Sequence, residues 1–290
     1  MKVKFWGTRG SIPVPGEKTV IYGGNTPCIQ VISKHGSSII IDAGTGIRNL
    51  GIELLSGNHS KELNIFISHS HWDHIQGIPF FLPFFRKDFK INIFSNTCNN
   101  MDVAHIIDSQ MHPFYFPVNK EEVFKSDINY FKIKPNEFYH FDGLTIETAK
   151  VHHSQGTLAF KITEDDKSVV YMTDNEIFYN ALDSKPDTEL IYKLNKEQLD
   201  FCKDADYLIH DSQYTLDDFD KKIGWGHSNN IALSYFSILA NVKNLLLFHY
   251  DPDYSDKMVE MLLKSTQIFL KDKNSSVNCI ASKELLEIDI

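Results

Sequence analysis

Histidine and aspartate side chains are concentrated in one six-residue segment, HSHWDH at residues 69–74, directly after an apolar run that predicts a strand. Alternate residues of an extended segment point the same way, so His69 and His71 can bind one ion. Asp73 and His74, where the chain is expected to turn into a helix, can bind a second ion. Nitrogen and oxygen donors of this kind suit zinc, with manganese and iron as alternatives.

A centre with two ions needs about seven protein groups, so further ligands are expected at the ends of later strands. His152 and His153 follow one predicted strand, Asp174 follows the next, and His249 ends the last. A single histidine at a strand end is more often a surface residue than a ligand. Because the HSHWDH segment already indicates a metal site, the histidines and the aspartate at these later strand ends are together interpreted as further ligands.

The bulk composition is that of an ordinary globular protein of 290 residues, so a single domain is expected, with insertions at about 80–143 and 175–203. No apolar run approaches the roughly 18 residues that span a bilayer, and no signal peptide is visible. The sequence therefore predicts a cytoplasmic protein without a membrane anchor. The four cysteines are far apart and form no CxxC pair, which argues against a disulfide framework.

The formal net charge of −9 disfavours a long nucleic-acid partner, because such binding depends on many lysine and arginine contacts to phosphate. Two divalent ions would nevertheless make the field inside a cleft positive. A small phosphate-containing substrate therefore remains compatible with the acidic chain.

Strands separated by helices indicate two sheets flanked by helices. Strands are predicted at residues 3–6, 28–33, 38–42, 63–67, 91–94, 144–151, 157–162, 169–173, 207–209 and 245–248. Helices are predicted at about 47–55, 75–85, 99–110, 229–240 and 255–270. The aromatic, proline-containing segment 112–117 is expected to be irregular, and either lines a pocket or closes an edge of the core.

Several motifs in order resemble the metallo-β-lactamase superfamily, and within it the ribonuclease Z and cyclic-phosphodiesterase branch. They are FWGTRGSIP at 5–13, IDAGTG at 41–46, HSHWDH at 69–74, YMTD at 171–174, HDSQYT at 210–215, GHS at 226–228 and FH at 248–249. The resemblance implies an α/β fold, a four-layer αββα sandwich with the metals at one edge of the facing sheets. It argues against antibiotic hydrolysis, since secreted β-lactamases place a cysteine in the second metal site.

The resemblance also implies a ligand set. One ion would be bound by His69, His71 and His153, the other by Asp73, His74 and His249, with Asp174 bridging them. His153 is preferred over His152 because the family's ligand precedes a short turn with glycine, here 154–156. Relatives often carry Pro-Gly-Gly there, so the choice between the two histidines stays open. Asp42 is expected behind the metal histidines, holding the loop by hydrogen bonds.

His227, in the glycine-flanked segment 224–228, is the candidate general acid or oxyanion stabiliser. The resemblance assigns Asp211 to orient it, which would raise its pKa and fix its tautomer. Asp73 is counted among the catalytic residues as well as the ligands. The alternative is that Ser228 caps a helix and His227 is incidental.

The function predicted first is a phosphodiesterase in which hydroxide bridging two metal ions attacks a small or cyclic phosphodiester or nucleotide. The alternatives are a tRNA 3′-processing endoribonuclease, an ester, thioester or lactone hydrolase, and a metal-bound ligand-binding protein with little turnover. Ribonuclease Z carries an RNA-gripping arm between the third histidine and the bridging aspartate, and the short spacing of His153 and Asp174 leaves no room for one. The apolar helices are compatible with a homodimer.

Overall fold

The computed structural model describes residues 1–57, 59–96, 103–154, 156–179 and 188–290, which form two seven-stranded mixed sheets. In spatial order the first sheet contains β14 (Glu287–Asp289), β1 (Lys2–Gly7), β2 (Cys28–Ile32), β3 (Ser38–Ile41), β4 (Glu62–Ile67), β5 (Lys90–Ser95) and β6 (Asp127–Lys132). The second contains β13 (Asn278–Ala281), β12 (Asn244–Phe248), β11 (Tyr207–Asp211), β10 (Lys167–Met172), β9 (Leu158–Glu164), β8 (Leu144–Lys150) and β7 (Phe138–Phe141).

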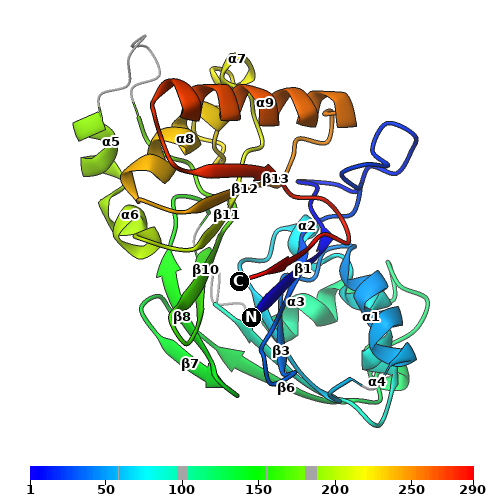
Figure 1. Cartoon of the computed structure of the whole chain (residues 1–290). Coiled ribbons are helices and arrows are strands. Elements are labelled where there is room, and N and C mark those ends of the chain that lie inside the picture. Colours follow the sequence, from blue (N-terminus) through cyan, green and yellow to red (C-terminus); the bar gives the residue numbers. More distant parts are fainter. Residues whose placement is uncertain (58, 97–102, 155, 180–187) are drawn as a thin grey trace.

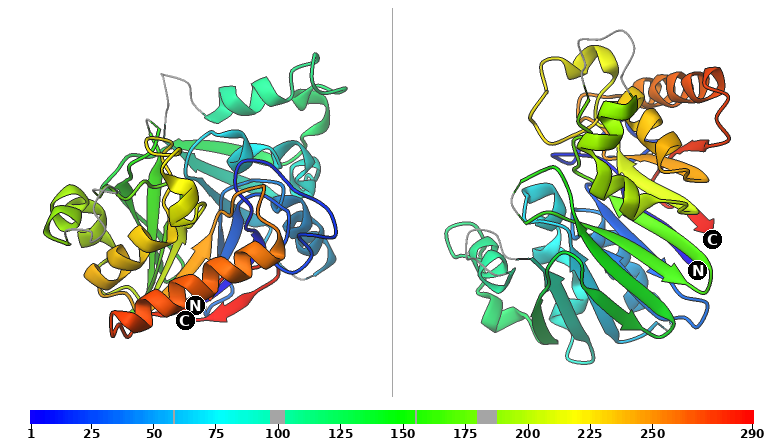
Figure 2. Two further views of the ribbon diagram at one scale, coloured as in Figure 1. Left: turned by 90° about the horizontal axis from the view of Figure 1, so that it is seen from above. Right: turned by 90° about the vertical axis from the view of Figure 1, so that its left-hand side faces the viewer.

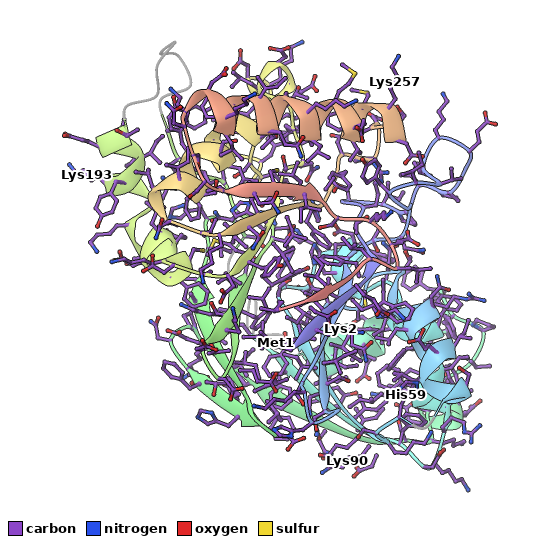
Figure 3. All side chains as sticks on the ribbon, in the orientation of Figure 1. Met1, Lys2, His59, Lys90, Lys193 and Lys257 are labelled. Atoms are coloured by element: carbon purple, nitrogen blue, oxygen red, sulfur yellow. The ribbon has the colours of Figure 1, made fainter. Side chains whose placement is uncertain are left out.

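The central core lies between the two sheets. Alternate side chains of a strand point to one face, and one face of each sheet supplies large apolar residues to a shared cluster. Phe5 and Phe66 from the first sheet join Phe160, Tyr171 and Phe248 from the second, all fully buried. Figure 3 shows side chains filling this space, whereas the labelled Lys193 and Lys257 lie on the exposed surface.

Helices cover the outer face of each sheet, as Figure 1 shows. The first sheet packs on α1 (Ile47–Ser56), α2 (Trp72–Ile75), the 3-10 turns η1 (Ile78–Phe80) and η2 (Leu82–Phe85), and α3 (Val103–Gln110). The second packs on α5 (Thr188–Leu194), α6 (Lys196–Cys202), α8 (Asn230–Leu239) and α9 (Asp256–Asp272). Short helices α4 (Lys120–Val123) and α7 (Leu216–Phe219) lie in connections. The expected αββα sandwich is confirmed (Figure 2).

The helix predicted at 75–85 was wrong, because the segment is divided among α2, η1 and η2. Pro79 and Pro83 stand at the second positions of the two 3-10 turns, and a proline has no N–H with which to continue an α-helix. The sequence analysis also missed β6, β7, β13 and β14, of which β14 has only three residues.

The range 80–143, expected to hold an insertion, contributes β5, β6 and β7 to the two sheets. Part of the range 175–203, and residues 99–102 of the predicted helix at 99–110, lie outside the described residues. The single domain and its insertion boundaries stay predictions, as do the cytoplasmic location and the homodimer. Within the described residues, no helix has both the length and the apolar character that crossing a bilayer requires.

Candidate metal centre

Three site residues stand directly after strands, in a backbone conformation that L-residues rarely adopt. Asp42 follows β3, Asp174 lies just beyond β10 and His249 follows β12, with φ of 61°, 57° and 56°. Each left-handed residue costs of order 1–3 kcal/mol and persists only where the surrounding structure imposes it. The HSHWDH segment follows the end of β4, so four strand ends meet at one rim of the sandwich.

The first group of candidate ligands contains His69, His71, His153 and Asp174. His69 Nε2 lies 3.3 Å and His153 Nε2 3.6 Å from Asp174 Oδ2. The third imidazole closes the group, because His71 Nδ1 lies 3.1 Å from His153 Nε2.

The second group contains Asp73, His74, His249 and again Asp174. His249 Nε2 lies 3.0 Å from Asp73 Oδ2 and 3.2 Å from Asp174 Oδ1. His74 Nε2 lies 3.4 Å from Asp73 Oδ2 and 3.3 Å from Asp174 Oδ2. The structure therefore brings together all seven residues that the sequence analysis predicted as ligands, and Asp174 is common to both groups.

The donor atoms fit a pair of divalent ions. Within each group one donor atom from every residue lies within 4.8 Å of the others. The Nε2 atoms of His69 and His74 are buried and have no hydrogen-bond partner among the described residues, a costly state unless a further group binds there. Imidazole nitrogens with carboxylate oxygens suit zinc and similar ions, so the donor set suits a dinuclear site for divalent metal ions.

The protonation states of the first group favour metal binding. Burial, aided by neighbouring imidazoles, lowers the pKa of His69, His71 and His153 to about 4. These rings are therefore neutral at pH 7 and can donate a lone pair to an ion. Burial would raise the pKa of Asp174, but His249 and His74 lower it well below its ordinary value, which keeps this shared carboxylate ionised.

Hydrogen bonds behind the ligands fix their tautomers. His153 Nδ1 lies 2.9 Å from the Gly226 carbonyl oxygen, and His249 Nδ1 lies 3.0 Å from Gln213 Oε1. Because these oxygens only accept, each Nδ1 carries the proton and each Nε2 lone pair is left for an ion. Ser11 N donates to Asp73 Oδ2 at 2.8 Å. Sequence reasoning missed Gly226, Gln213 and Ser11 in these roles, although all three lie in the quoted motifs.

Asp42 lies behind His74, where the resemblance places it. Its carboxylate accepts hydrogen bonds from Ser68 N at 2.7 Å, Ser68 Oγ at 2.9 Å and the Tyr171 hydroxyl at 2.6 Å. His74 Nδ1 lies 2.7 Å from Asp42 Oδ2. Asp42 thus holds both ends of the HSHWDH segment, through two contacts to Ser68 and one to His74, and its fourth contact, to Tyr171, reaches the second sheet.

The two adjacent histidines that the sequence left open have different surroundings. His153 belongs to the first group, whereas His152 belongs to neither. His152 Nδ1 lies 3.2 Å from the Glu176 carbonyl oxygen, and its ring stacks on Phe178 at 4.2 Å between centroids. The geometry therefore favours His153 as the ligand.

His227 lies over both groups. Its ring centroid is 5.2 Å from that of His153 and 5.1 Å from that of His249. The loop that carries it is fixed by Glu176, whose carboxylate accepts from Gly224 N and Gly226 N, each at 2.8 Å. Burial lowers the pKa of His227, but Asp174 and Asp211 outweigh this effect, so its pKa lies above the ordinary value.

Asp211 is placed beside His227 without a close hydrogen bond, since His227 Nδ1 and Asp211 Oδ2 are 3.8 Å apart. The Asp211 carboxylate instead accepts from Asn175 N at 2.9 Å and Ser228 N at 2.7 Å. The alternative in which Ser228 caps the following helix was wrong. The cap of α8 is Asn229, whose side chain accepts from the N–H groups of residues 231 and 232.

Residues 37–250, more than half of the chain, match the family model of the beta-lactamase superfamily domain. The chain belongs to this superfamily. One curated relative is the ribonuclease Z of Picrophilus torridus, which is 26% identical to this chain over 325 aligned residues. The alignment covers 100% of this chain and 96% of the relative. Another is the ribonuclease Z of Sulfurisphaera tokodaii (strain DSM 16993 / JCM 10545 / NBRC 100140 / 7), 28% identical over 84% of this chain and 88% of the relative. The resemblance to the ribonuclease Z branch is thereby confirmed.

Among solved structures, the metallo-beta-lactamase fold protein YhfI from Bacillus subtilis shares the fold of this superfamily member, with a TM-score of 0.66, 18% identity and coverage of 99% of both chains. The short form of human tRNase Z matches with a TM-score of 0.63, 17% identity and coverage of 100% of this chain and 99% of that one. These similarities establish the fold. Together with the family match, they support a superfamily hydrolase with a candidate dinuclear metal site.

Proposed function

We propose that this chain hydrolyses phosphodiester bonds with two divalent metal ions, zinc being the first candidate. The observation that carries the proposal is Asp174, which belongs to both groups of candidate ligands and so would link the two ions. The first ion would be held by His69, His71 and His153, and the second by Asp73, His74 and His249. Bound there, two divalent ions supply Lewis acidity and make hydroxide available near neutral pH.

His227 is the proposed proton donor to the leaving oxygen. Its ring lies beside one histidine of each group, where the reacting phosphate would be held. Asp211 Oδ2 lies 3.8 Å from His227 Nδ1 and favours the protonated imidazole, which can donate a proton or stabilise negative charge. Two backbone N–H groups hold the Asp211 carboxylate in this position. A proton donor matters most when the leaving group is a poor one, such as the alkoxide of a phosphodiester, and less when an ester has a good leaving group.

The relatives favour RNA as the substrate, because the curated proteins described above carry the name ribonuclease Z. This candidate takes precedence over the small cyclic phosphodiester that the sequence analysis placed first. A specific observation keeps the small substrate as a second candidate. Between His153 and Asp174 the described residues form the antiparallel pair β9 and β10, and two residues, Asp165 and Asp166, connect these strands. The short spacing of His153 and Asp174 in the sequence leaves no room for an RNA-gripping arm at this place.

A panel of substrates tests the proposal on zinc- and manganese-loaded protein. The panel contains bis-p-nitrophenyl phosphate, cyclic nucleotides, a p-nitrophenyl carboxylate ester and precursor tRNA with a 3′ trailer. We expect phosphodiester cleavage that chelation abolishes and that His227→Ala slows about 100-fold or more. Cleavage of precursor tRNA at the trailer would select the RNA candidate, and turnover of cyclic nucleotides alone the other. Inactivity on every phosphodiester with two metal equivalents bound would overturn the proposal.

A further inference from the structure

Successive residues of the HSHWDH segment face two different cavities. Ser70 and Trp72 line a cavity of about 420 Å³ beside α3. His71, between them in sequence, lines a second cavity of about 520 Å³ together with the candidate ligand His153. Each of the two segment residues that line the first cavity, Ser70 and Trp72, thus has a candidate ligand on both sides of it in the sequence.

The first cavity is bounded by large, exposed aromatic side chains. Trp72 is 71% exposed and Tyr115 is 80% exposed, and both line it. The opposite wall comes from α3, including Ile106. Figure 2 shows α3 and the segment after it standing out from the body of the sandwich. Tyr115 thus lines a pocket, which was one of the two alternatives for segment 112–117.

None of the described residues that line this cavity is aspartate, glutamate, lysine or arginine, and its polar side chains come from Ser70, His105, Ser109, Gln110 and Tyr115. Gln110 Nε2 donates to the Ile75 carbonyl oxygen at 3.2 Å, and this hydrogen bond joins α3 to the end of α2 at the cavity wall. The exposed aromatic rings together with Ile75 and Ile106 suit a flat, largely apolar ring.

We propose that this cavity, the Trp72 pocket formed by Ser70, Trp72, Ile75, Ile106, Gln110 and Tyr115, binds the nucleobase next to the phosphodiester bond that is cleaved. The inference rests on the proposed function and holds for both of its candidate substrates. The base stacks on an aromatic side chain of the pocket, as bases do in many nucleic-acid-binding proteins. The phosphate then lies at the metal centre.

The kinetic test compares two phosphodiesters with the same leaving group, the p-nitrophenyl esters of thymidine 5′-phosphate and of methyl phosphate. Only the first carries a base. We expect Trp72→Ala and Tyr115→Ala each to lower the ratio of the two kcat/KM values about tenfold, the effect of losing one stacking partner. Phe138→Ala is the matched control, because this aromatic residue is 59% exposed on β7 and does not line the pocket. An unchanged ratio in both pocket variants would overturn the inference.

Trp72 stands between two candidate ligands, so its replacement can disturb the metal centre as well as the pocket. Tyr115 is remote in sequence from every candidate ligand, so Tyr115→Ala tests the pocket independently of the metal centre. Metal content is measured for each variant. Light scattering of the wild type and Tyr115→Ala adds a further arm. If Tyr115→Ala converts a dimer into a monomer, a second copy of the chain covers the pocket and the inference is wrong.

A binding measurement separates failure of this inference from failure of the proposed function. Calorimetry with adenosine 5′-monophosphate on the zinc-loaded protein needs no turnover. We expect Tyr115→Ala to raise the Kd about tenfold. A wild type that binds the nucleotide through Tyr115 but cleaves no phosphodiester would contradict the proposed function alone. No binding by the wild type, or a loss of affinity in Trp225→Ala with none in Tyr115→Ala, would overturn the inference, because Trp225 lines the second cavity.

Discussion

The phenol of Tyr171 donates a hydrogen bond of 2.6 Å to Asp42 Oδ2, and this bond joins the two sheets directly behind the metal centre. Tyr171 lies on β10 of the second sheet, and Asp42 follows β3 of the first. Both side chains are fully buried. Because Asp42 also contacts His74 Nδ1, the position of this candidate ligand, which lies on α2 beside the first sheet, depends on a residue of the second sheet.

Replacement of this phenol is expected to destabilise the protein. Tyr171→Phe removes a hydrogen bond to a buried carboxylate and should lower the free energy of unfolding by about 1–3 kcal/mol, measured by urea denaturation of the metal-free protein. Tyr22→Phe is the control, because the Tyr22 hydroxyl donates to Glu260 at the surface and its loss should cost less than about 1 kcal/mol. Equal losses in the two variants would contradict the importance of the contact between the sheets.

The neighbouring histidines His152 and His153 provide a matched pair for metal binding. His153→Ala removes a donor of the first group, so we expect its metal affinity to fall about 100-fold or more, with fewer than two equivalents retained after dialysis. His152→Ala removes a ring that stacks on Phe178 and should retain both equivalents. Elemental analysis of the dialysed proteins measures the difference. The reverse pattern would assign the ligand to His152.

Glycines 224 and 226 form a second matched pair, because both have positive φ, of 83° and 82°. A Cβ at Gly226 would lie 2.0 Å from His153 Nδ1, whereas a Cβ at Gly224 meets nothing within 4 Å. Each alanine variant should lose roughly 1–2 kcal/mol of stability through backbone strain. Only Gly226→Ala should also displace His153 and lower the metal content. Equal metal content in the two variants would show that the ring tolerates the added methyl group.

Asp206 should contribute stability that is lost in acid. It is buried and accepts hydrogen bonds from Lys243 Nζ at 2.7 Å and Ser168 N at 2.9 Å. Burial raises the pKa of Asp206, but the two hydrogen bonds lower it by a larger amount. The pKa of folded Asp206 therefore lies below its ordinary value. The stabilisation is therefore complete above the unfolded pKa, about 3.9, and disappears as the pH falls through the folded pKa.

The variant Asp206→Asn tests this contribution. Its free energy of unfolding should decline less steeply than that of the wild type below about pH 4 in metal-free protein. Lys243→Gln removes the principal donor and should reduce the decline in the same direction. Parallel curves for the wild type and both variants would rule out a contribution from Asp206.

The sequence by itself determined which residues could bind metal and where they stand relative to the strands. The spacing in HSHWDH, together with Asp174 and His249 at strand ends, sufficed because strands have a fixed side-chain period and sheets bring strand ends to one rim. The two-sheet architecture followed from the alternation of apolar runs and helical patterns. Local periodicity failed at 75–85, where prolines divide an apolar stretch into short turns.

Only the tertiary structure decided which of two adjacent histidines enters the site, because His152 and His153 differ in the backbone direction of a short turn and not in chemistry. The partners Gln213 and Tyr171 depend equally on contacts between residues far apart in the chain. The Trp72 pocket requires α3 to pack beside the HSHWDH segment. Such contacts arise from the relative placement of whole elements, which local sequence patterns do not encode.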